Sequence, residues 1–406
     1  MFTHRTFFQL FITCIGLVCV TILLSLPASA QDLKSVTYVA NPTSSASYIL
    51  PPSDVSFRAH SYSRFENTFA LNQISKLSNS VSYPPCGYPA RWVVRNQLPI
   101  PAEAVGVANN ADSIYAIGGY SFQTSSDINQ TLRYDLNTNS WTTLTPVPHV
   151  VTLASVIYSS LNNKLYVFGG QDLDGSDIYS STLIYDPGLN SWSTGASMPG
   201  VRTSMAKGYY NGKVYLVGGF NTKDTSSAQA QTWEYDVLTD TWMSKASIPE
   251  AFGGAGSGVV DGRLYVFGGS DPVSVARVQT YEYDIALDKW SAKANMPYAA
   301  NVPGAAVLGD KIWVIGGGIP YMQLGIFTPS LPLNSPVALG TTLIYDPGTD
   351  SWNNGPVLSV PRSFIGAAGY KNIAIAIGGY YDNSVGTVGT TEVMGLCQAY
   401  LPGLLK

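Results

Sequence analysis

The chain has 406 residues, of which 12% are charged and 45% hydrophobic, and it is rich in Gly (39) and Tyr (26). This profile is typical of many short buried strands joined by turns, and it argues against a disordered chain or a coiled coil. The formal net charge of −4 provides no basic surface for nucleic acid or anionic lipid, so we expect no nucleic-acid partner.

Residues 1–30 have the pattern of a signal peptide. Phe7–Leu26 is a nearly unbroken apolar run, and Ala28–Ala30 gives the small-x-small pattern of a cleavage site. We therefore expect a mature chain that begins near Gln31, is secreted to the extracellular space or the periplasm, and has no membrane segment after cleavage. The apolar run is also long enough to span a bilayer, so an uncleaved anchor is the alternative.

An internal repeat organises most of the remaining chain. An apolar run ends in a Gly-Gly pair six times, and successive pairs lie 51, 49, 50, 48 and 62 residues apart. The first residues of these pairs are Gly118, Gly169, Gly218, Gly268, Gly316 and Gly378. A Trp precedes each pair by 26 residues in five repeats and by 28 in the other: Trp92, Trp141, Trp192, Trp242, Trp290 and Trp352.

A Tyr-Asp dipeptide lies before five of these Trp residues, always with seven residues from Tyr to Trp. Turn sequences that need positive φ, such as Asn211-Gly212 and Asp261-Gly262, precede the strand that runs into the Gly pair. Each repeat is therefore predicted to hold four short antiparallel strands. Such a unit exposes apolar residues on both faces, and radial stacking buries them, so we predict an all-β, six-bladed propeller.

This combination of Gly-Gly, Tyr and Trp at a period of about 50 residues resembles the kelch repeat. The resemblance covers residues 86–397 and implies a ring closed by a mixed blade. In that blade, the strand at Trp92 joins the strands near residues 366–396. Residues 31–85, rich in Ser, Asn and Pro, are predicted to be a flexible leader, and residues 398–406 a short tail.

The two cysteines of the mature chain are predicted to close the ring. Cys86 and Cys397 both fall on the turn between the third and fourth strands of the mixed blade, which is the one turn that this blade lacks as continuous chain. An even pair in an oxidising compartment indicates a disulfide, and two unpaired thiols are the alternative.

Chain direction separates two rims of the ring. The loops after each Gly pair share one rim with the loops that lead from each Trp to the next blade, and we call this the Gly-Gly rim. The Tyr-Asp turns lie on the other, which we call the Tyr-Asp rim. The Gly-Gly rim has the longer and more varied loops, so we expect a binding site there.

Two arginines share one repeat position on the Gly-Gly rim, ten residues past a Trp. These are Arg202 and Arg362, and the other four repeats have Ala102, Val151, Phe252 and Ala300 there. The kelch resemblance implies that such an arginine faces a central pocket, where its planar guanidinium holds carboxylate or sugar oxygens. The alternative is an arginine whose hydrogen bonds are satisfied by loop carbonyls.

Other ligand candidates on this rim are aromatic or acidic. They are Tyr120, Phe220, Tyr380, Tyr381, Phe252 and Glu103. Aromatic faces suit sugar rings, although packing between blades explains such residues equally well. The uncharged loop Gly318–Thr342 is predicted to cover the pore or a neighbouring blade, the alternative being an exposed apolar patch.

The sequence favours a binding protein over an enzyme. Some kelch-type propellers are copper oxidases, whose site needs two histidines and a cysteine crosslinked to a tyrosine. In the mature chain His60 lies in the leader, which leaves only His149 in the ring, and both cysteines are assigned to ring closure. We expect no metal and no cofactor. The alternating oxygen donors at Asp172–Asp177 resemble a calcium loop but lack its twelfth-position carboxylate.

We therefore expect a monomeric, non-catalytic module that binds a carbohydrate or a protein. The alternative is a sugar-modifying enzyme, epimerase- or lyase-like, that uses metal-independent acid–base chemistry. Its acid–base groups would come from Glu103, Glu250, Arg202 and Arg362, but spacing marks no pair among them. A purely structural surface protein is a third interpretation.

Native protein alkylated without reduction should carry no label on Cys86 or Cys397, as read by intact mass. The loop-entropy model gives roughly 5 kcal/mol of stabilisation for a disulfide that closes so long a loop. Two labelled cysteines in native material would refute the disulfide closure.

Overall fold

The computed structural model describes residues 91–395 except 111, 174–176, 321–335, 371 and 382–385, and also four short strands nearer the N-terminus. The chain divides into two units, residues 1–73 and 74–406. In the first unit β1 (Phe7–Gln9) pairs with β2 (Leu23–Ser25), and β3 (Val36–Asn41) pairs with β4 (Ser44–Tyr48). Cys86 and Cys397 lie outside the described residues.

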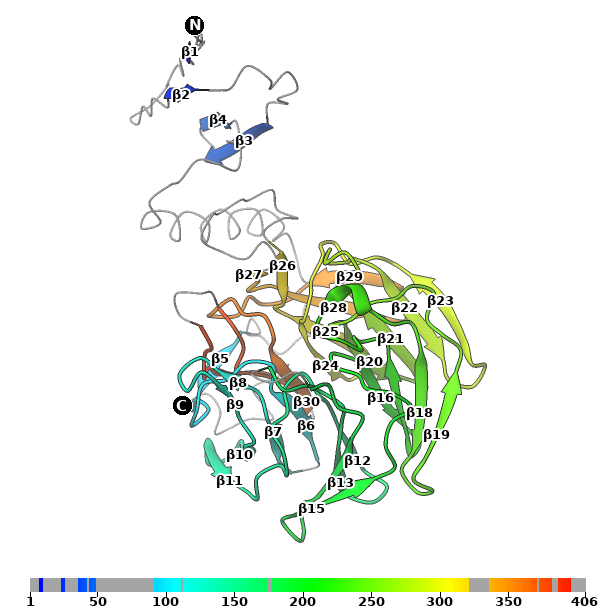
Figure 1. Cartoon of the computed structure of the whole chain (residues 1–406). Helices are drawn as coiled ribbons and strands as arrows, with labels where there is room; N and C mark the ends of the chain where they lie inside the picture. Colours follow the sequence, from blue (N-terminus) through cyan, green and yellow to red (C-terminus); the bar gives the residue numbers. More distant parts are fainter. Residues whose placement is uncertain are drawn as a thin grey trace, which may run out of the picture. The chain divides into compact units, whose positions relative to one another are not determined.

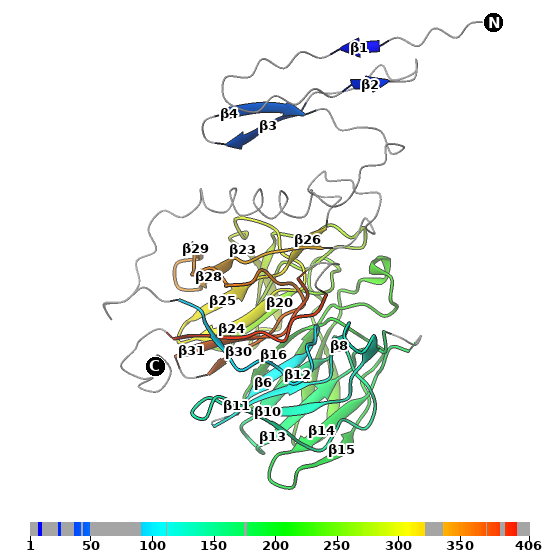
Figure 2. The same cartoon turned by 90° about the vertical axis from the view of Figure 1, so that its left-hand side faces the viewer.

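The second unit contains six four-stranded antiparallel sheets, which are the blades of a propeller (Figures 1 and 2). The strands of each blade are given from the inner to the outer strand. Blade 1 is β6 (Gly106–Asn109), β7 (Ile114–Ile117), β10 (Thr131–Asp135) and β11 (Ser140–Thr143). Blade 2 is β12 (Ser155–Ser159), β13 (Lys164–Phe168), β14 (Thr182–Asp186) and β15 (Ser191–Gly195), and blade 3 is β16 (Ala206–Tyr210), β17 (Lys213–Val217), β18 (Thr232–Asp236) and β19 (Thr241–Lys245).

Blades 4 to 6 follow the same order. Blade 4 is β20 (Gly256–Val260), β21 (Arg263–Phe267), β22 (Thr280–Asp284) and β23 (Lys289–Lys293); blade 5 is β24 (Gly304–Leu308), β25 (Lys311–Ile315), β28 (Thr342–Asp346) and β29 (Ser351–Asn354); and blade 6 is β30 (Gly366–Tyr370), β31 (Ile373–Ile377), β32 (Thr391–Gly395) and β5 (Val93–Arg95). The inner strands contact one another in sequence around the ring, and β30 contacts β6.

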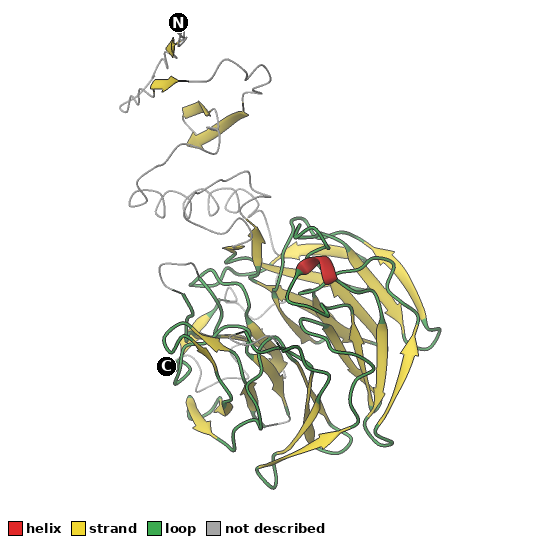
Figure 3. Cartoon of the chain, in the orientation of Figure 1, coloured by secondary structure: helices red, strands yellow, loops and turns green. Residues whose placement is uncertain are grey.

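Short elements lie in the rim loops. β8 (Tyr120–Ser121) pairs with β9 (Ser126–Asp127), and β26 (Gly318–Pro320) pairs with β27 (Pro336–Ala338). Within the described residues, the one helical segment is the 3-10 turn η2 (Thr225–Ser227), so the all-β prediction is confirmed (Figure 3).

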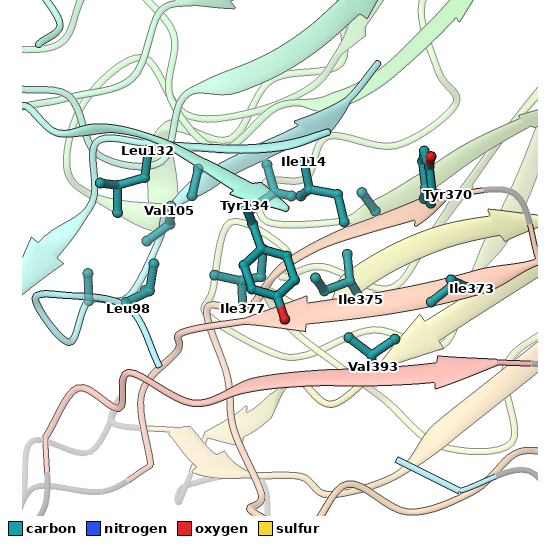
Figure 4. Close-up of a cluster of buried hydrophobic side chains, with 14 of the residues drawn as sticks. Leu98, Val105, Ile114, Leu132, Tyr134, Tyr370, Ile373, Ile375, Ile377 and Val393 are labelled. Atoms are coloured by element: carbon teal, nitrogen blue, oxygen red, sulfur yellow. The ribbon is translucent and has the colours of Figure 1, made fainter. Parts of the chain in front are cut away.

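The first and last strands of the ring share blade 6. β5 pairs antiparallel with β32, placing Arg95 opposite Thr391. Apolar side chains of blades 1 and 6 then form one buried cluster, in which Ile114 and Tyr134 face Ile375 and Ile377 (Figure 4). Burial of this surface, at about 25 cal/mol per Å² of apolar area, stabilises the contact between the two ends of the repeat array.

The Gly-Gly pair joins each blade to the segment leading into the next blade. Gly118 has φ of 65°, and a Cβ there would lie 2.0 Å from the carbonyl oxygen of Val151. The next residue, Gly119, donates its N–H to this same carbonyl at 2.9 Å. The other five pairs repeat the contact, and their acceptors are Arg202, Phe252, Ala300, Arg362 and Ala102.

The Tyr-to-Trp spacing also joins neighbouring blades, at the outer edge of each blade. In blade 3 the Tyr235 hydroxyl donates to Asp240 Oδ1 at 2.6 Å, and this oxygen also accepts the Ala196 N–H of blade 2 at 2.7 Å. Trp242 Nε1 donates to the Ala196 carbonyl at 2.9 Å. A spacing of seven therefore places Tyr and Trp side by side, with ring centroids 4.9 Å apart, so that both hold the preceding blade.

Replacing Gly118 by Ala should destabilise the propeller more than replacing Gly309, whose φ of 60° is similar but whose Cβ would meet no atom within 4 Å. Gly309→Ala should cost about 1–2 kcal/mol for the left-handed backbone alone. Gly118→Ala adds a collision with a backbone carbonyl, for about 1–3 kcal/mol more. Urea unfolding measures both variants, and equal losses would show that the close approach to Val151 is unimportant.

Candidate functional site

A pocket of about 560 Å³ opens on the Gly-Gly rim at blade 4. One wall is Glu250 and Ala251, in the segment that leads into the blade, and the other is the loop from Asp271 to Gln279 after the fourth Gly pair. Asp271 shapes this loop, because its Oδ1 accepts the N–H groups of Val273 and Val275 at 3.0 and 2.9 Å. Those two valines are exposed, Val273 to 75%.

The guanidinium of Arg277 is held firmly within this pocket. Its Nε donates to Gln279 Oε1 at 3.2 Å, its Nη1 donates to the Ala251 carbonyl at 3.3 Å, and its Nη2 pairs with Glu250. Burial lowers the pKa of Arg277, which remains charged at neutral pH. The pocket therefore combines a fixed cation, the exposed carboxylate of Glu250, the acidic Asp271 and adjacent apolar side chains.

The sequence identified Glu250 but missed Arg277. Arg277 is the one basic residue in the loop after the fourth Gly pair, and this was the available signal. The pocket depends on how two separate loops meet, which the repeat spacing does not describe.

The two arginines predicted to face a central pocket lie inside their blades. Arg362 and Glu392 are both 0% exposed and form an ion pair. The Arg362 Nη1 also donates to the carbonyls of Gly378 and Thr390, at 2.9 and 2.7 Å. Glu392 Oε1 accepts the N–H and the hydroxyl of Ser359. The structure therefore favours the alternative interpretation of Arg362, a side chain satisfied by carbonyls.

Arg202 is buried in the equivalent place in blade 3. Its guanidinium carbon lies 4.6 Å from the centroid of the Trp233 ring, and its Nη2 donates to Gln231 Oε1 at 3.0 Å. Burial lowers its pKa to about 10. Arg202 and Arg362 thus pack against the third strand of the blade that follows them, and not against each other.

Part of the predicted aromatic set is brought together where blades 1 and 6 meet. The rings of Tyr120 and Phe122 have centroids 5.3 Å apart, and those of Phe122 and Tyr380 5.8 Å apart. Phe122 is 46% exposed and Tyr380 is buried. We call these three residues the aromatic cluster. The neighbouring Tyr381 is half-buried.

Two other aromatic candidates lie on the opposite side of the ring. Phe252 is 2% exposed, and its side chain belongs to the hydrophobic core between blades 3 and 4, so a ligand on the rim has no access to its ring. Phe220 is half-buried and lies over Gly253. The structure therefore favours blade packing as the role of Phe252.

The loop predicted to cover the pore or a neighbour lies partly outside the described residues. Its described ends pair as β26 and β27, and Ile319 packs against the core that blades 4 and 5 share.

Glu103 is a buried acid on blade 1. Its backbone pairs with that of Tyr120, and its Oε2 has no hydrogen-bond partner among the described residues. Burial raises its pKa to about 8, so the carboxyl group is mostly protonated at neutral pH. Glu250 precedes blade 4, on the far side of a six-membered ring, so these two acids do not face one another.

The part of the chain that the structure describes contains no cluster of three or more His, Cys, Asp or Glu side chains able to hold a metal ion. None of the described helical residues forms a segment long and apolar enough to cross a membrane.

Replacing Glu103 by Gln should remove part of the pH dependence of stability. Because the folded-state pKa is raised from 4.5 to about 8, the buried carboxyl carries no penalty below pH 4.5, and the protein loses a few kcal/mol of stability as pH rises to about 8. Urea unfolding of Glu103→Gln at pH 5 and pH 8 should show a smaller difference than the wild type. Glu250→Gln, at an exposed position, is the control, and the prediction fails if both variants keep the wild-type pH slope.

Comparison with known proteins agrees with this architecture. Residues 104–317, more than half of the chain, match the family model described as the KLHDC2/KLHL20/DRC7 Kelch-repeats domain. A kelch domain-containing protein of Sulfurisphaera tokodaii is 40% identical over 86 residues, which are 21% of this chain and 12% of that protein. Alpha-scruin of Limulus polyphemus is 31% identical over 140 residues, covering 33% and 15% of the two chains.

Kelch-like protein 25 of Xenopus tropicalis is 30% identical over 130 residues, which are 30% of this chain and 22% of that protein. The matches thus span less than a quarter of each of these three relatives. A solved structure titled "Structure of YjhT" superimposes with a TM-score of 0.61 at 18% identity, over 73% of this chain and 95% of that chain, and this likeness shows the fold alone. By its repeats, its blades and the family model that it matches, the chain belongs to the kelch-repeat β-propellers.

Proposed function

We propose that this chain is a non-catalytic binding module that holds a segment of another protein on its Gly-Gly rim, anchored in the blade 4 pocket. The observation that carries the proposal is the fixed Arg277 guanidinium inside a pocket that the exposed Val275 also lines. Kelch-repeat propellers typically act as protein-interaction modules, which supports the same interpretation.

The pocket offers the mixture of contacts that protein interfaces use. Arginine is enriched among the residues that dominate binding, particularly where its surroundings exclude water. Arg277 has its side chain fixed by three partners, so little conformational entropy remains to be lost on binding. Exposed Val273 and Val275 add apolar surface beside it.

A carbohydrate is the second candidate ligand, and the aromatic cluster supports it. The exposed ring of Phe122 stands beside Tyr120 and Tyr380, and an aromatic face of this kind can stack on the apolar face of a sugar. This cluster lies at blades 1 and 6, away from the blade 4 pocket. The two ligand classes would therefore use different parts of the rim.

We also propose that the protein is exported and monomeric, with Cys86 and Cys397 joined. The apolar run followed by Ala28–Ala30 supports export, and the oxidising compartment that export implies supports the disulfide. Under this proposal the partner is an extracellular or periplasmic protein or glycan.

Peptides selected from a displayed random library on the purified full chain should lose affinity when Val273 is replaced by Asp. A bound peptide would bury the new carboxylate beside the pocket, which should weaken binding about tenfold or more, corresponding to about 1.4 kcal/mol, as measured by fluorescence anisotropy. Leu189→Asp is the matched control, because Leu189 is 76% exposed but lies on the Tyr-Asp rim.

Loss of binding in Leu189→Asp but not in Val273→Asp would move the site to the other rim and overturn the proposal. A glycan array with the same protein tests the second candidate, for which Phe122→Ala should abolish binding and Val273→Asp should not. Turnover of a free sugar would replace both proposals with an enzyme.

A further inference from the structure

The six inner strands contact one another in a circle around the axis of the ring. In blades 3 to 6 these strands alternate between buried and half-buried residues. The half-buried residues also contact the neighbouring blade, and because they lie on the innermost strands we infer that solvent reaches them from the axis of the ring, which we call the central channel. The residues that line this central channel in blades 3 to 6 are Lys207, Tyr209, Ser257, Val259, Ala305, Val307, Ala367 and Gly369.

Lys207 is the one charged residue in the inner strands β6, β12, β16, β20, β24 and β30. The equivalent positions in the other blades are small or uncharged: Val107, Val156, Ser257, Ala305 and Ala367. A propeller of this kind therefore does not need a lysine at this position to pack its blades.

The ammonium group of Lys207 lies close to the axis of the ring. Its Nζ donates to the carbonyl of Val156 at 2.9 Å, in blade 2, and to that of Val107 at 3.4 Å, in blade 1. A side chain of blade 3 that reaches both blades must extend across the channel. Among the described residues, no carboxylate lies within ion-pair distance of this nitrogen, and two of its three N–H donors are occupied by carbonyls.

An ammonium group in this position is unfavourable without an anion. Burial lowers the pKa of Lys207 to about 8, so the group is still mostly charged at neutral pH. Glu103, the buried acid on blade 1, is mostly neutral at that pH and supplies little counter-charge. The ionisable groups on the strands packed against β16 are Tyr158 on β12 and Tyr215 and Lys213 on β17; burial raises the pKa of both tyrosines, and Lys213 pairs with Asp236.

We propose that the central channel binds a small monovalent anion, a halide or a short carboxylate, against the Lys207 ammonium. The remaining N–H of this group is available as a charged donor. Ser257, Ala305 and Ala367, which have the same repeat position as Lys207, have small side chains and are half-buried, so solvent reaches this level of the ring. A single ammonium charge matches one negative charge. This site is separate from the rim pocket and does not depend on its function.

Thermal unfolding of the full chain at pH 7 tests the proposal. Formate, acetate, chloride and bromide are titrated separately, and sodium gluconate, a larger anion, keeps the ionic strength constant. The Tm of the wild type should rise with the logarithm of the anion concentration above the Kd, by about 5 °C at about 100 times the Kd. Lys207→Met should be at least as stable as the wild type without anion and should show no such gain.

The pattern of anions identifies the source of the ligand. A response to chloride and bromide shows a halide site, and a response confined to formate and acetate shows a carboxylate site. The gain should also disappear in the wild type at pH 9.5, where Lys207 is deprotonated but the neighbouring tyrosines are not. Equal responses in the wild type and Lys207→Met, or no rise of the wild-type Tm with anion concentration, would overturn the proposal.

Discussion

The hydrogen bond from the second glycine of each Gly-Gly pair to the segment leading into the next blade is the contact on which this ring depends. The six bonds are 2.8–2.9 Å long and join every blade to its neighbour, the sixth to the first included. A second circle of backbone hydrogen bonds lies beside them, in which Leu153 donates to Ala104, Ser204 to Leu153, and so on until Ala104 donates to Phe364. Because both circles use only backbone atoms, they constrain conformation but leave most side chains free to vary.

That freedom explains why the candidate sites differ from blade to blade. The repeat position of Arg202 and Arg362 supplies a carbonyl to the Gly pair whatever its side chain is. The side chain then meets the third strand of its blade, which provides Trp233 in one case and Glu392 in the other. One backbone role thus supports two different solutions for a buried guanidinium, a cation–π contact and an ion pair.

The sequence predicted the architecture well because the contacts that build it are local and periodic. Tyr, Trp and the Gly pair recur at fixed spacings, so the six copies of the pattern predicted the blades and their number. The roles of single residues were harder to predict, since they depend on partners in other strands. Glu392 stands where the other blades have Leu132, Leu183, Trp233, Tyr281 and Leu343, and a position-by-position comparison of the repeats would have marked it as the partner of Arg362. The same comparison would have singled out Lys207 among small residues.

The buried charged residues differ in whether the fold itself neutralises their charge, and this difference distinguishes structural residues from candidate functional ones. Arg362 and Glu392 neutralise each other, and the groups that hydrogen-bond to them, in Ser359, Gly378 and Thr390, lie in the same part of the chain. Glu103 avoids the cost of burial by keeping its proton. Lys207 is neither paired with an opposite charge nor neutral. Its described partners are carbonyls, and its pKa is lowered only to about 8. A closed ring repeats its backbone six times, and a charge that only one blade carries is therefore a feature that closure does not require. A residue of this kind is therefore a candidate for a function specific to this propeller.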